Sequence, residues 1–554
     1  MCRKILTVFT VLIVVVLTGQ GYAQATKDEL VIGISQFPTG FHPNLNSHVA
    51  ASYIMGMARR PMTTYNSDWN LICVLCIELP DLEKGTAREW TTSEGKPGMA
   101  TDYTIRSDAV WGDGTPITTD DVQFVWDVGH APDAGANDQE MYRQMEKLEI
   151  HDDKGFTIYW NKRQCAYKGI GSFELVPAHL DRAAFAEPAE YKNRTLYETD
   201  TTNPGLYFGP YRITRVEPGA MVVLEENPTW WGNTPQFKRI IVRVIENTAA
   251  LEANLLSGEV DYIAGEDGLS LDQALAFETR HGDAYDVVYK QGLFYEHIDL
   301  MLDNPILAER KVRAALLHAA NRDAISQQLF EGKQPVAHGS VNPLDKVYYP
   351  DVPKYEYDPG RASALLSEAG WDVIKDGVRY NQKGEKLSLE LMTTAGNRVR
   401  ELVEQALQSD WKQVGVEVRI RNEPPRVLFG ETITKRKFTA MAMFAWFSSP
   451  ENIPFGTMHS TMIPTEKNNW SGQNFTGYHN AEMDDALDRI QVECADNVQN
   501  ELWRKIQTIY ATDLPVLPLY FRSTPFVLPK WLKGVVPTGH QSPSTLWIED
   551  WRAE

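Results

Sequence analysis

The residues of this chain that could do covalent chemistry do not assemble into a common catalytic motif. Gly112 and Gly114 are followed by Ile117, where a third glycine would complete a dinucleotide-binding fingerprint. The sequence contains no G-x-x-x-x-G-K-[ST] phosphate loop, no G-x-S-x-G nucleophile elbow and no H-E-x-x-H zinc helix. His42 and His48 are the nearest approach to a metal-ligand pair, but their spacing does not aim both rings at one ion. We therefore expect no enzyme activity, no cofactor and no metal site, although a secreted hydrolase built from residues distant in sequence stays an alternative.

The cysteines form one close pair in the sequence. Cys73 and Cys76 lie in the apolar run 71–77, whereas Cys165 and Cys494 stand alone and far apart. A C-x-x-C pair can be redox-active or supply half of a zinc site, but no second ligand pair follows at a suitable spacing. We interpret Cys73 and Cys76 as a buried pair that an oxidising compartment can bridge, and the sequence leaves open whether they are bridged.

Two polar segments carry more aromatic side chains than a simple loop requires. Residues 443–452 read M-F-A-W-F-S-S-P-E-N, and residues 468–478 read N-N-W-S-G-Q-N-F-T-G-Y. Aromatic rings on loops held by a rigid scaffold supply apolar contact area with little loss of entropy. A single such ring can instead pin its loop to the body of the protein. The two segments together favour a binding surface.

Strand and helix signals are interspersed along the whole chain, which indicates an α/β or α+β architecture. Turn residues between strand-like runs predict hairpins over 148–160, 211–225 and 373–380. Apolar spacing predicts core-facing helices over 248–257, 308–320 and 358–370. In the last of these, Asp358 and Pro359 favour a helix start, and Gly370 favours its end.

Composition and charge limit the classes of function. The 554 residues are 43% apolar and 23% charged, which is typical of a globular protein with more than one core. Acids outnumber bases by 74 to 54, and the formal charge of −20 provides no global basic field to hold phosphate backbones. We therefore expect no nucleic-acid partner. An acidic surface suits a protein that diffuses as a monomer.

Residues 1–25 predict a secretory signal peptide. Arg3 and Lys4 precede an apolar run of about 13 residues, which is short for a membrane span of roughly 20. Cleavage is expected after Ala25, with Ala23 as the alternative. No later stretch approaches the length of a membrane span. We therefore expect a soluble, periplasmic protein without a lipid anchor.

Six motifs along the mature chain resemble, in order, those of the extracellular solute-binding proteins of ABC importers, specifically the peptide/nickel-type class called family 5. The most specific is W-G-D-G-T-P-I-T-T-D-D-V at 111–122, which looks like the family's W-x-D-G-x-P-[hydrophobic]-T-x-x-D-V signature. The others are G-P-Y at 209–211 with N-P-T-W-W at 227–231, L-S-G-E-V-D-Y at 256–262, V-R-A-A-L at 312–316 with N-R at 321–322, Y-D-P to A-G-W at 357–371, and L-P-V-L-P-L-Y at 514–520.

The resemblance implies an α/β, two-lobed periplasmic-binding-protein fold of type II, in its large three-domain variant. Lobe I is expected to combine residues 26–66, 200–297 and 510–554. A small additional domain is expected at 67–199, and lobe II at 298–509. The chain is expected to cross between the lobes near 295–298 and near 509–510.

The same resemblance implies a function without catalysis. The protein is expected to capture a peptide or peptide-like solute between two closing lobes and to deliver it to an ABC permease in the membrane. Similar proteins also carry nickel complexes, opines and oligosaccharides, and these remain alternatives. In relatives that bind peptides, a W-x-x-D motif places an aspartate on the ligand's ammonium group. Here Ser449 stands at that position, and a hydroxyl cannot neutralise an ammonium ion.

The expected ligand contacts come from two segments. The apolar run 440–445 predicts a strand that delivers its end to the cleft, so that Trp446 and Phe447 wall the ligand and Ser449 offers one neutral hydrogen bond. Glu451 is the nearest carboxylate that could replace the missing aspartate. As in similar proteins, an early loop is expected to approach from lobe I, through Phe37, Thr39, Phe41 and His42.

Overall fold

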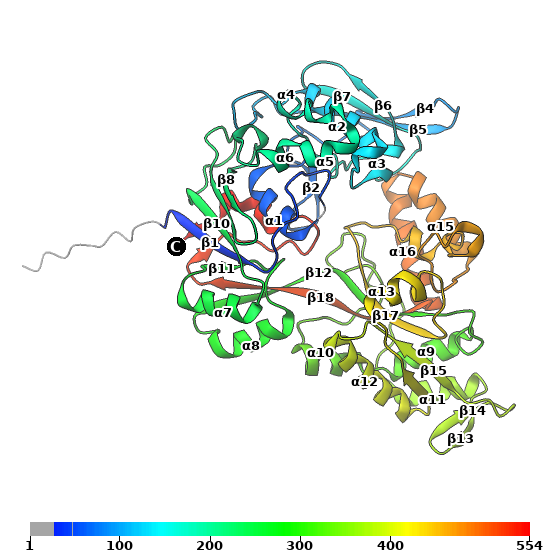
Figure 1. Ribbon diagram of the computed structural model, residues 1–554. Coiled ribbons are helices and arrows are strands. Elements are labelled where there is room, and N and C mark those ends of the chain that lie inside the picture. Colours follow the sequence, from blue (N-terminus) through cyan, green and yellow to red (C-terminus); the bar gives the residue numbers. More distant parts are fainter. Residues whose placement is uncertain (1–26, 47) are drawn as a thin grey trace, which may run out of the picture.

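A ten-stranded sheet runs through the whole molecule in the computed structural model, which describes residues 27–46 and 48–554 (Figure 1). The expected signal peptide, residues 1–25, lies outside the described residues. The strand order of the sheet is β16 (Glu417–Ile420), β15 (Ser388–Met392), β17 (Met441–Phe447), β12 (Tyr285–Leu300), β18 (Val516–Pro529), β11 (Tyr262–Ile263), β1 (Glu29–Ile34), β10 (Arg239–Val244), β9 (Met221–Glu226) and β8 (Tyr211–Glu217).

The remaining strands form smaller sheets. A four-stranded sheet has the order β4 (Ala87–Thr91), β5 (Pro97–Thr104), β7 (Gly155–Trp160) and β6 (Met145–Ile150). Two-stranded sheets pair β2 (Thr63–Tyr65) with β3 (Leu71–Cys73), β13 (Val373–Lys375) with β14 (Val378–Tyr380), and β19 (Leu532–Lys533) with β20 (Arg552–Ala553). The longer helices are α1 (Val49–Ala58), α2 (Thr119–His130), α3 (Gln139–Gln144), α7 (Thr248–Ser257), α8 (Leu271–His281), α9 (Arg310–Ala319), α10 (Arg322–Phe330), α11 (Pro359–Glu368), α12 (Arg398–Gln413), α15 (Ala481–Val492) and α16 (Asp496–Asp513).

The hydrophobic cores divide the molecule into two bodies. The first body has one large core built from residues between 30 and 264 and between 526 and 551. The larger cores of the second body lie between residues 298 and 520, and a small cluster of Tyr295, Ala337 and Phe521 lies beside them. Because the large core draws on both the expected lobe I and the expected small domain, the boundaries at 66/67 and 199/200 stay a prediction. Figure 1 shows the four-stranded sheet and α2 above the ten-stranded sheet, and the second body at lower right.

The two longest strands, β12 and β18, cross between the bodies. They pair antiparallel, with register shifts between Gln291 and Tyr295 and between Glu296 and His297. The first expected crossing, at 295–298, therefore lies within β12. The second crossing lies later than the expected 509–510, because Tyr510 is in α16 and belongs to a core of the second body. The chain returns to the first body only through β18.

Local signals placed many elements correctly. The three expected hairpins are present as β6 with β7, β8 with β9, and β13 with β14. The helix expected over 358–370 is α11, in which Asp358 accepts the Arg361 N–H at 2.8 Å and Gly370 adopts a φ of +87°. The helix expected over 248–257 is α7, and it ends at Gly258 with a φ of +81°.

The signature motif at 111–122 forms a helix start and a set of hydrogen bonds within the first body. Thr118 is the N-cap of α2, and the Asp121 carboxylate accepts the Thr118 N–H at 2.9 Å. The same carboxylate accepts the Trp111 Nε1–H at 3.2 Å and the Ala178 N–H at 2.8 Å. Asp121 therefore joins a turn, a helix start and a distant loop inside the first body.

All four described cysteines are in disulfides. Cys73 pairs with Cys76 inside the first body, which answers the question that the sequence left open. Cys165 pairs with Cys494, and their sequence separation is 329 residues. This second bridge was missed by sequence reasoning, and it joins the first body to the second.

Candidate ligand-binding cleft

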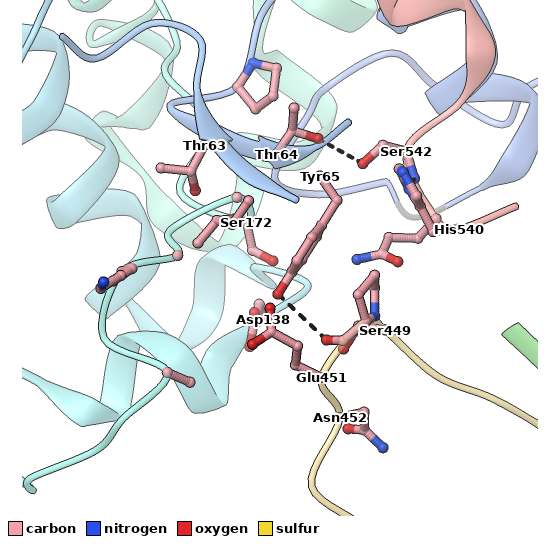
Figure 2. Close-up of a pocket in the computed structure, with 18 of the residues that line it drawn as sticks. Thr63, Thr64, Tyr65, Asp138, Ser172, Ser449, Glu451, Asn452, His540 and Ser542 are labelled. Carbon is pink, nitrogen blue, oxygen red and sulfur yellow. Dashed lines mark hydrogen bonds between the residues drawn. The ribbon is translucent and has the colours of Figure 1, made fainter. Parts of the chain in front are cut away.

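A cavity of about 1820 Å³ lies between the two bodies. The first body contributes α1, β2 and the loop at 538–546, together with residues 161–174 near the four-stranded sheet. The second body contributes residues 447–455, which follow β17, and residues of α15 and α16. Segments far apart in sequence therefore face one another across the cavity, as the close-up in Figure 2 shows for Tyr65, Ser172, Ser449 and His540.

Strand β17 ends at the wall of the main cavity. Residues 441–444 are buried, and Phe447 at the strand's end is 47% exposed and lines the cavity. Phe294 of β12 packs on Phe447 with a centroid distance of 4.5 Å. Trp446 faces the other way, stacks on Phe475 at 5.9 Å and lines a second, smaller cavity. The two rings therefore wall two adjoining spaces.

The turn after β17 brings Ser449 and Glu451 to the cavity wall. Glu451 adopts a φ of +57°, a strained conformation that its surroundings hold in place. Its backbone N–H donates to Asp345 Oδ2 at 2.7 Å, and its carboxylate pairs with Lys346 at 2.9 Å. Glu451 is thus already neutralised by a lysine.

A hydrogen bond spans the cleft at this turn. Tyr65 of β2 donates its hydroxyl to the Pro450 carbonyl at 3.4 Å, and Figure 2 shows the ring reaching from the first body toward Ser449 and Glu451. Burial first, and the carboxylates of Glu451 and Asp345 second, raise the pKa of Tyr65. Tyr65 therefore stays a neutral donor and contributes no charge to the wall.

The early loop does not reach the cavity where it was expected to. Phe37 and Phe41 pack on the core of the first body, and Thr39 is exposed away from the cavity lining. His42 is only 1% exposed; it accepts the Asn44 N–H through Nδ1 at 3.2 Å and lies 3.0 Å from the Tyr191 hydroxyl through Nε2.

The loop meets the cavity a few residues later, through Pro43, Asn44 and Asn46. The shift has a physical cause, because the His42 ring is held by Tyr191, which in turn donates to Asp181 at 2.5 Å. No local pattern near residue 42 indicates partners this far along the chain.

The aromatic segment at 468–478 has a different role from the one expected. Phe475 and Tyr478 are buried, and the Asn474 side chain holds the segment by donating to the His459 and Tyr478 carbonyls at 3.1 and 2.9 Å. These rings pin their loop to the second body. Gln473 and Thr476 of this segment line the smaller cavity, and none of its residues lines the main one among the described residues.

The cavity wall carries charges of both signs. Its basic residues are Arg59, Lys96, Lys162, Arg163, Lys168 and Lys346, and its acidic residues are Asp138, Glu174, Glu266, Glu451 and Asp488. Several are already paired within the protein, for example Arg59 with Glu174 and Arg163 with Glu89. A wall of mixed and mostly compensated charge suits a ligand that is itself polar and carries both signs.

Among residues 27–46 and 48–554, no three histidine, cysteine, aspartate or glutamate side chains are grouped so as to hold a metal ion. Within the same residues, none of the helices combines the length and apolarity that a bilayer crossing needs.

Two bodies joined by a pair of long strands, with a large cavity between them, define a two-lobed solute-binding protein. The family described as bacterial extracellular solute-binding proteins, family 5 (middle), matches residues 81–463, and this chain belongs to that family. The oligopeptide-binding protein AppA of Bacillus subtilis (strain 168) is 25% identical over 516 residues, which span 91% of this chain and 88% of that protein.

Solved structures resemble the whole chain. An oligopeptide-binding protein from Thermus thermophilus, solved with a pentapeptide, is 30% identical with a TM-score of 0.67, and 95% of this chain and 96% of that chain are covered. NikA from Brucella suis, solved with Fe(III)-EDTA, has a TM-score of 0.77 at 19% identity, with 95% and 100% covered. The likeness to NikA shows the shared fold alone.

Proposed function

We propose that this protein is the solute-binding component of an ABC importer and that it captures a peptide or peptide-like solute in the cleft between its two bodies. The cavity of about 1820 Å³ carries this proposal. It exceeds the roughly 300–1,000 Å³ of pockets for drug-sized ligands, so it suits an oligomer better than a single small metal complex. The oligopeptide-binding relatives from Bacillus subtilis and Thermus thermophilus support the same ligand class.

The protein is proposed to act outside the cytoplasm, as a monomer, and to hand its solute to a permease in the membrane. It is proposed to bind without turnover. Nickel complexes, opines and oligosaccharides stay alternatives for the solute. The ligand contacts are proposed to be Trp446, Phe447, Ser449 and Glu451 from the second body, and Asn44 from the first.

The direct test is calorimetry of the mature protein with a tripeptide to pentapeptide pool, together with mass spectrometry of solutes retained through purification. Phe447→Ala should weaken peptide binding by about tenfold, because a ring that stacks on the ligand contributes on the order of 1 kcal/mol beyond its buried area. Phe429→Ala is a matched control, since Phe429 is also a half-exposed phenylalanine of the second body, at 40%, and does not line the cavity.

Two outcomes would contradict the proposal. One is that no peptide binds while a retained solute of another class is found. The other is that peptide is hydrolysed during the titration. Equal weakening by Phe447→Ala and Phe429→Ala would keep peptide binding but move it away from the end of β17.

A further inference from the structure

A second cavity of about 260 Å³ lies inside the second body, behind Trp446. It adjoins the main cleft, because Phe447, Ser449, Asn452 and Trp503 line both. A dry cavity of about 150 Å³ already admits benzene, so this side pocket has room for one ligand side chain or end group. A ligand in the cleft can therefore extend a group past Ser449 into it.

The side pocket combines aromatic rings with acids, and none of the described residues that line it is a lysine or an arginine. Its rings are Tyr295, Trp446, Phe447, Trp503, Tyr510 and Phe521, and its acids are Asp299 and Asp345. Aromatic faces and carboxylates both attract a cation, and the attraction grows where water is excluded. The lining chemistry is therefore that of a site for a positively charged, partly apolar group.

Asp299 lies next to a histidine of the same strand. His297 lies with Nδ1 at 3.1 Å from the Tyr295 carbonyl, and since a carbonyl only accepts, Nδ1 carries the hydrogen. Its Nε2 lies 3.2 Å from Asp299 Oδ1, and both groups are buried. Asp299 therefore has a basic side chain of its own strand within ion-pair distance.

Asp345 has no such partner. It is 7% exposed, and its oxygens accept only the backbone N–H groups of Glu451 and Val347, at 2.7 and 3.2 Å. Within the described chain it forms no ion pair, because the neighbouring Lys346 pairs with Glu451. Burial raises the pKa of Asp345, and the two amides act against this. A cation in the pocket would supply the missing charge partner.

We propose that the side pocket binds a cationic end of the ligand, an alkylammonium or guanidinium group, with Asp345 as its counter-ion and the surrounding rings as its walls. Asp345 in the side pocket thereby takes the role of ammonium counter-ion that Ser449 cannot fill. Glu451 keeps its ion pair with Lys346. The pocket deepens the proposed peptide-binding function by naming the charge of the bound group, but its test does not depend on peptides.

The test compares benzylammonium with benzyl alcohol, a neutral probe of nearly the same shape, by ligand-observed NMR titration of the mature protein. Wild type should bind benzylammonium at least about tenfold more tightly, as charge-assisted contacts in a buried site do. Asp345→Asn keeps the shape and should remove the preference. Asp372→Asn is the control, because Asp372 is exposed and bonds only to Gln382.

Equal affinity of the two probes for wild type would overturn the proposal, and so would a preference that survives in Asp345→Asn. Should Asp345→Asn not fold, Ser340→Lys replaces it, since Ser340 lines the pocket and a lysine there should repel benzylammonium but not benzyl alcohol. A preference for benzylammonium in a protein that binds no peptide would leave the pocket intact and reject the peptide function. Peptide binding by a protein that lacks this preference would support the peptide function and reject the cation pocket.

The Cys165–Cys494 disulfide ties the two bodies together at the rim of the cleft. Cys165 lines the main cavity, and its N–H donates to the Gln491 carbonyl at the end of α15 at 2.8 Å. Figure 1 places α15 below α3, to the right of the crossing strands β12 and β18. The bodies are therefore connected covalently at two separate places, by the strands and by the bridge.

We infer that this bridge limits how the cleft opens. A rigid body held at two places can only rotate about the line that joins them, so the rim at Cys165 stays closed while the rim at Tyr65 and Pro450 opens. Without the bridge, the two bodies should also be able to separate at Cys165, so that the ligand-free protein opens more widely.

The test is small-angle scattering of the ligand-free Cys165→Ser/Cys494→Ser variant. Its radius of gyration should exceed that of wild type. Cys73→Ser/Cys76→Ser is the matched control, because that bridge lies within the first body and its loss should leave the radius unchanged. Equal radii for wild type and the Cys165→Ser/Cys494→Ser variant would overturn the inference. So would a non-reducing peptide map of wild type that lacks the Cys165–Cys494 link.

Discussion

Glu296 holds the crossing between the two bodies through a buried cluster of charges. It is 0% exposed on β12, and its carboxylate accepts Arg400 Nε at 2.5 Å, Arg522 Nη2 at 2.5 Å and Arg522 Nε at 2.9 Å. Arg522 lies on β18 and Arg400 in the first turn of α12. Burial alone would raise the pKa of Glu296, but the two guanidinium groups outweigh it and hold the pKa below its ordinary value.

Glu296→Gln should therefore be strongly destabilising. Removing one partner of a buried ion pair costs about 3–5 kcal/mol, because the remaining charges lose their counter-ion. The lower end, about 3 kcal/mol, applies here because the Arg522 side chain is 35% exposed and water screens it. For 554 residues the unfolding entropy is roughly 1.2 kcal/mol per kelvin, so the melting temperature should fall by about 3 °C.

The assay is urea unfolding followed by circular dichroism, with calorimetric melting as a second measure. Glu368→Gln is the matched control, because Glu368 also pairs with two bases, Lys311 at 3.2 Å and Arg361 at 3.5 Å, but on the surface. Exposed pairs contribute about 0–1 kcal/mol. If Glu296→Gln loses no more stability than Glu368→Gln, the charge cluster does not hold the crossing, and the reasoning is refuted.

Three further changes test single features of the structure. Burial, and then the charge of Arg59, lower the pKa of His42 to about 3. Between about pH 6.5 and pH 3, the His42 side chain is therefore protonated in the unfolded chain but neutral in the native protein. Stability present above pH 6.5 is therefore lost as the pH falls, by about 2 kcal/mol at pH 5, and urea unfolding of His42→Gln should lack this loss; equal losses would contradict it. Ser449→Asp should strengthen calorimetric binding of a peptide with a free amino terminus by about tenfold or more over its acetylated form, and an equal gain for both would argue against an ammonium nearby. Thr118→Ala should cost about 1 kcal/mol of unfolding free energy by removing the N-cap of α2, and an unchanged urea midpoint would mean that the cap is dispensable.

The elements that the sequence predicted well are those whose signals are local. The turn at Pro218 and Gly219 and the helix start at Asp358 depend on residues within a few positions of one another, and both are present in the structure. The return crossing was misplaced because its position depends on which body Tyr510 packs into. That choice is made by contacts distant in sequence, which a local pattern does not report.

In the candidate site, too, residues with local signals were easier to place than residues whose partners are distant in sequence. Phe447 was placed at the cleft because an apolar run followed by polar residues indicates the end of a buried strand. His42 was misjudged because its partner Tyr191 lies 149 residues away, and a polar loop residue looks the same whether or not such a partner exists. The pairing of Cys165 with Cys494 was missed for the same reason: the two cysteines are 329 residues apart, and no local pattern connects them.

The position of the charges shows why a serine is tolerated at 449. An aspartate there would face the same space as Asp345 and Glu451, and like charges held close together in a buried site raise one another's pKa and disfavour ionisation. In this protein Glu451, in the turn after β17, pairs with Lys346, and Asp345, which accepts the Glu451 N–H, has no counter-ion within the described chain. The neutral hydroxyl of Ser449, which lines both cavities, adds no third charge to this wall. A bound cation would offset this repulsion, so Ser449→Asp should raise the preference for benzylammonium over benzyl alcohol, in the same direction as the gain expected for a peptide with a free amino terminus.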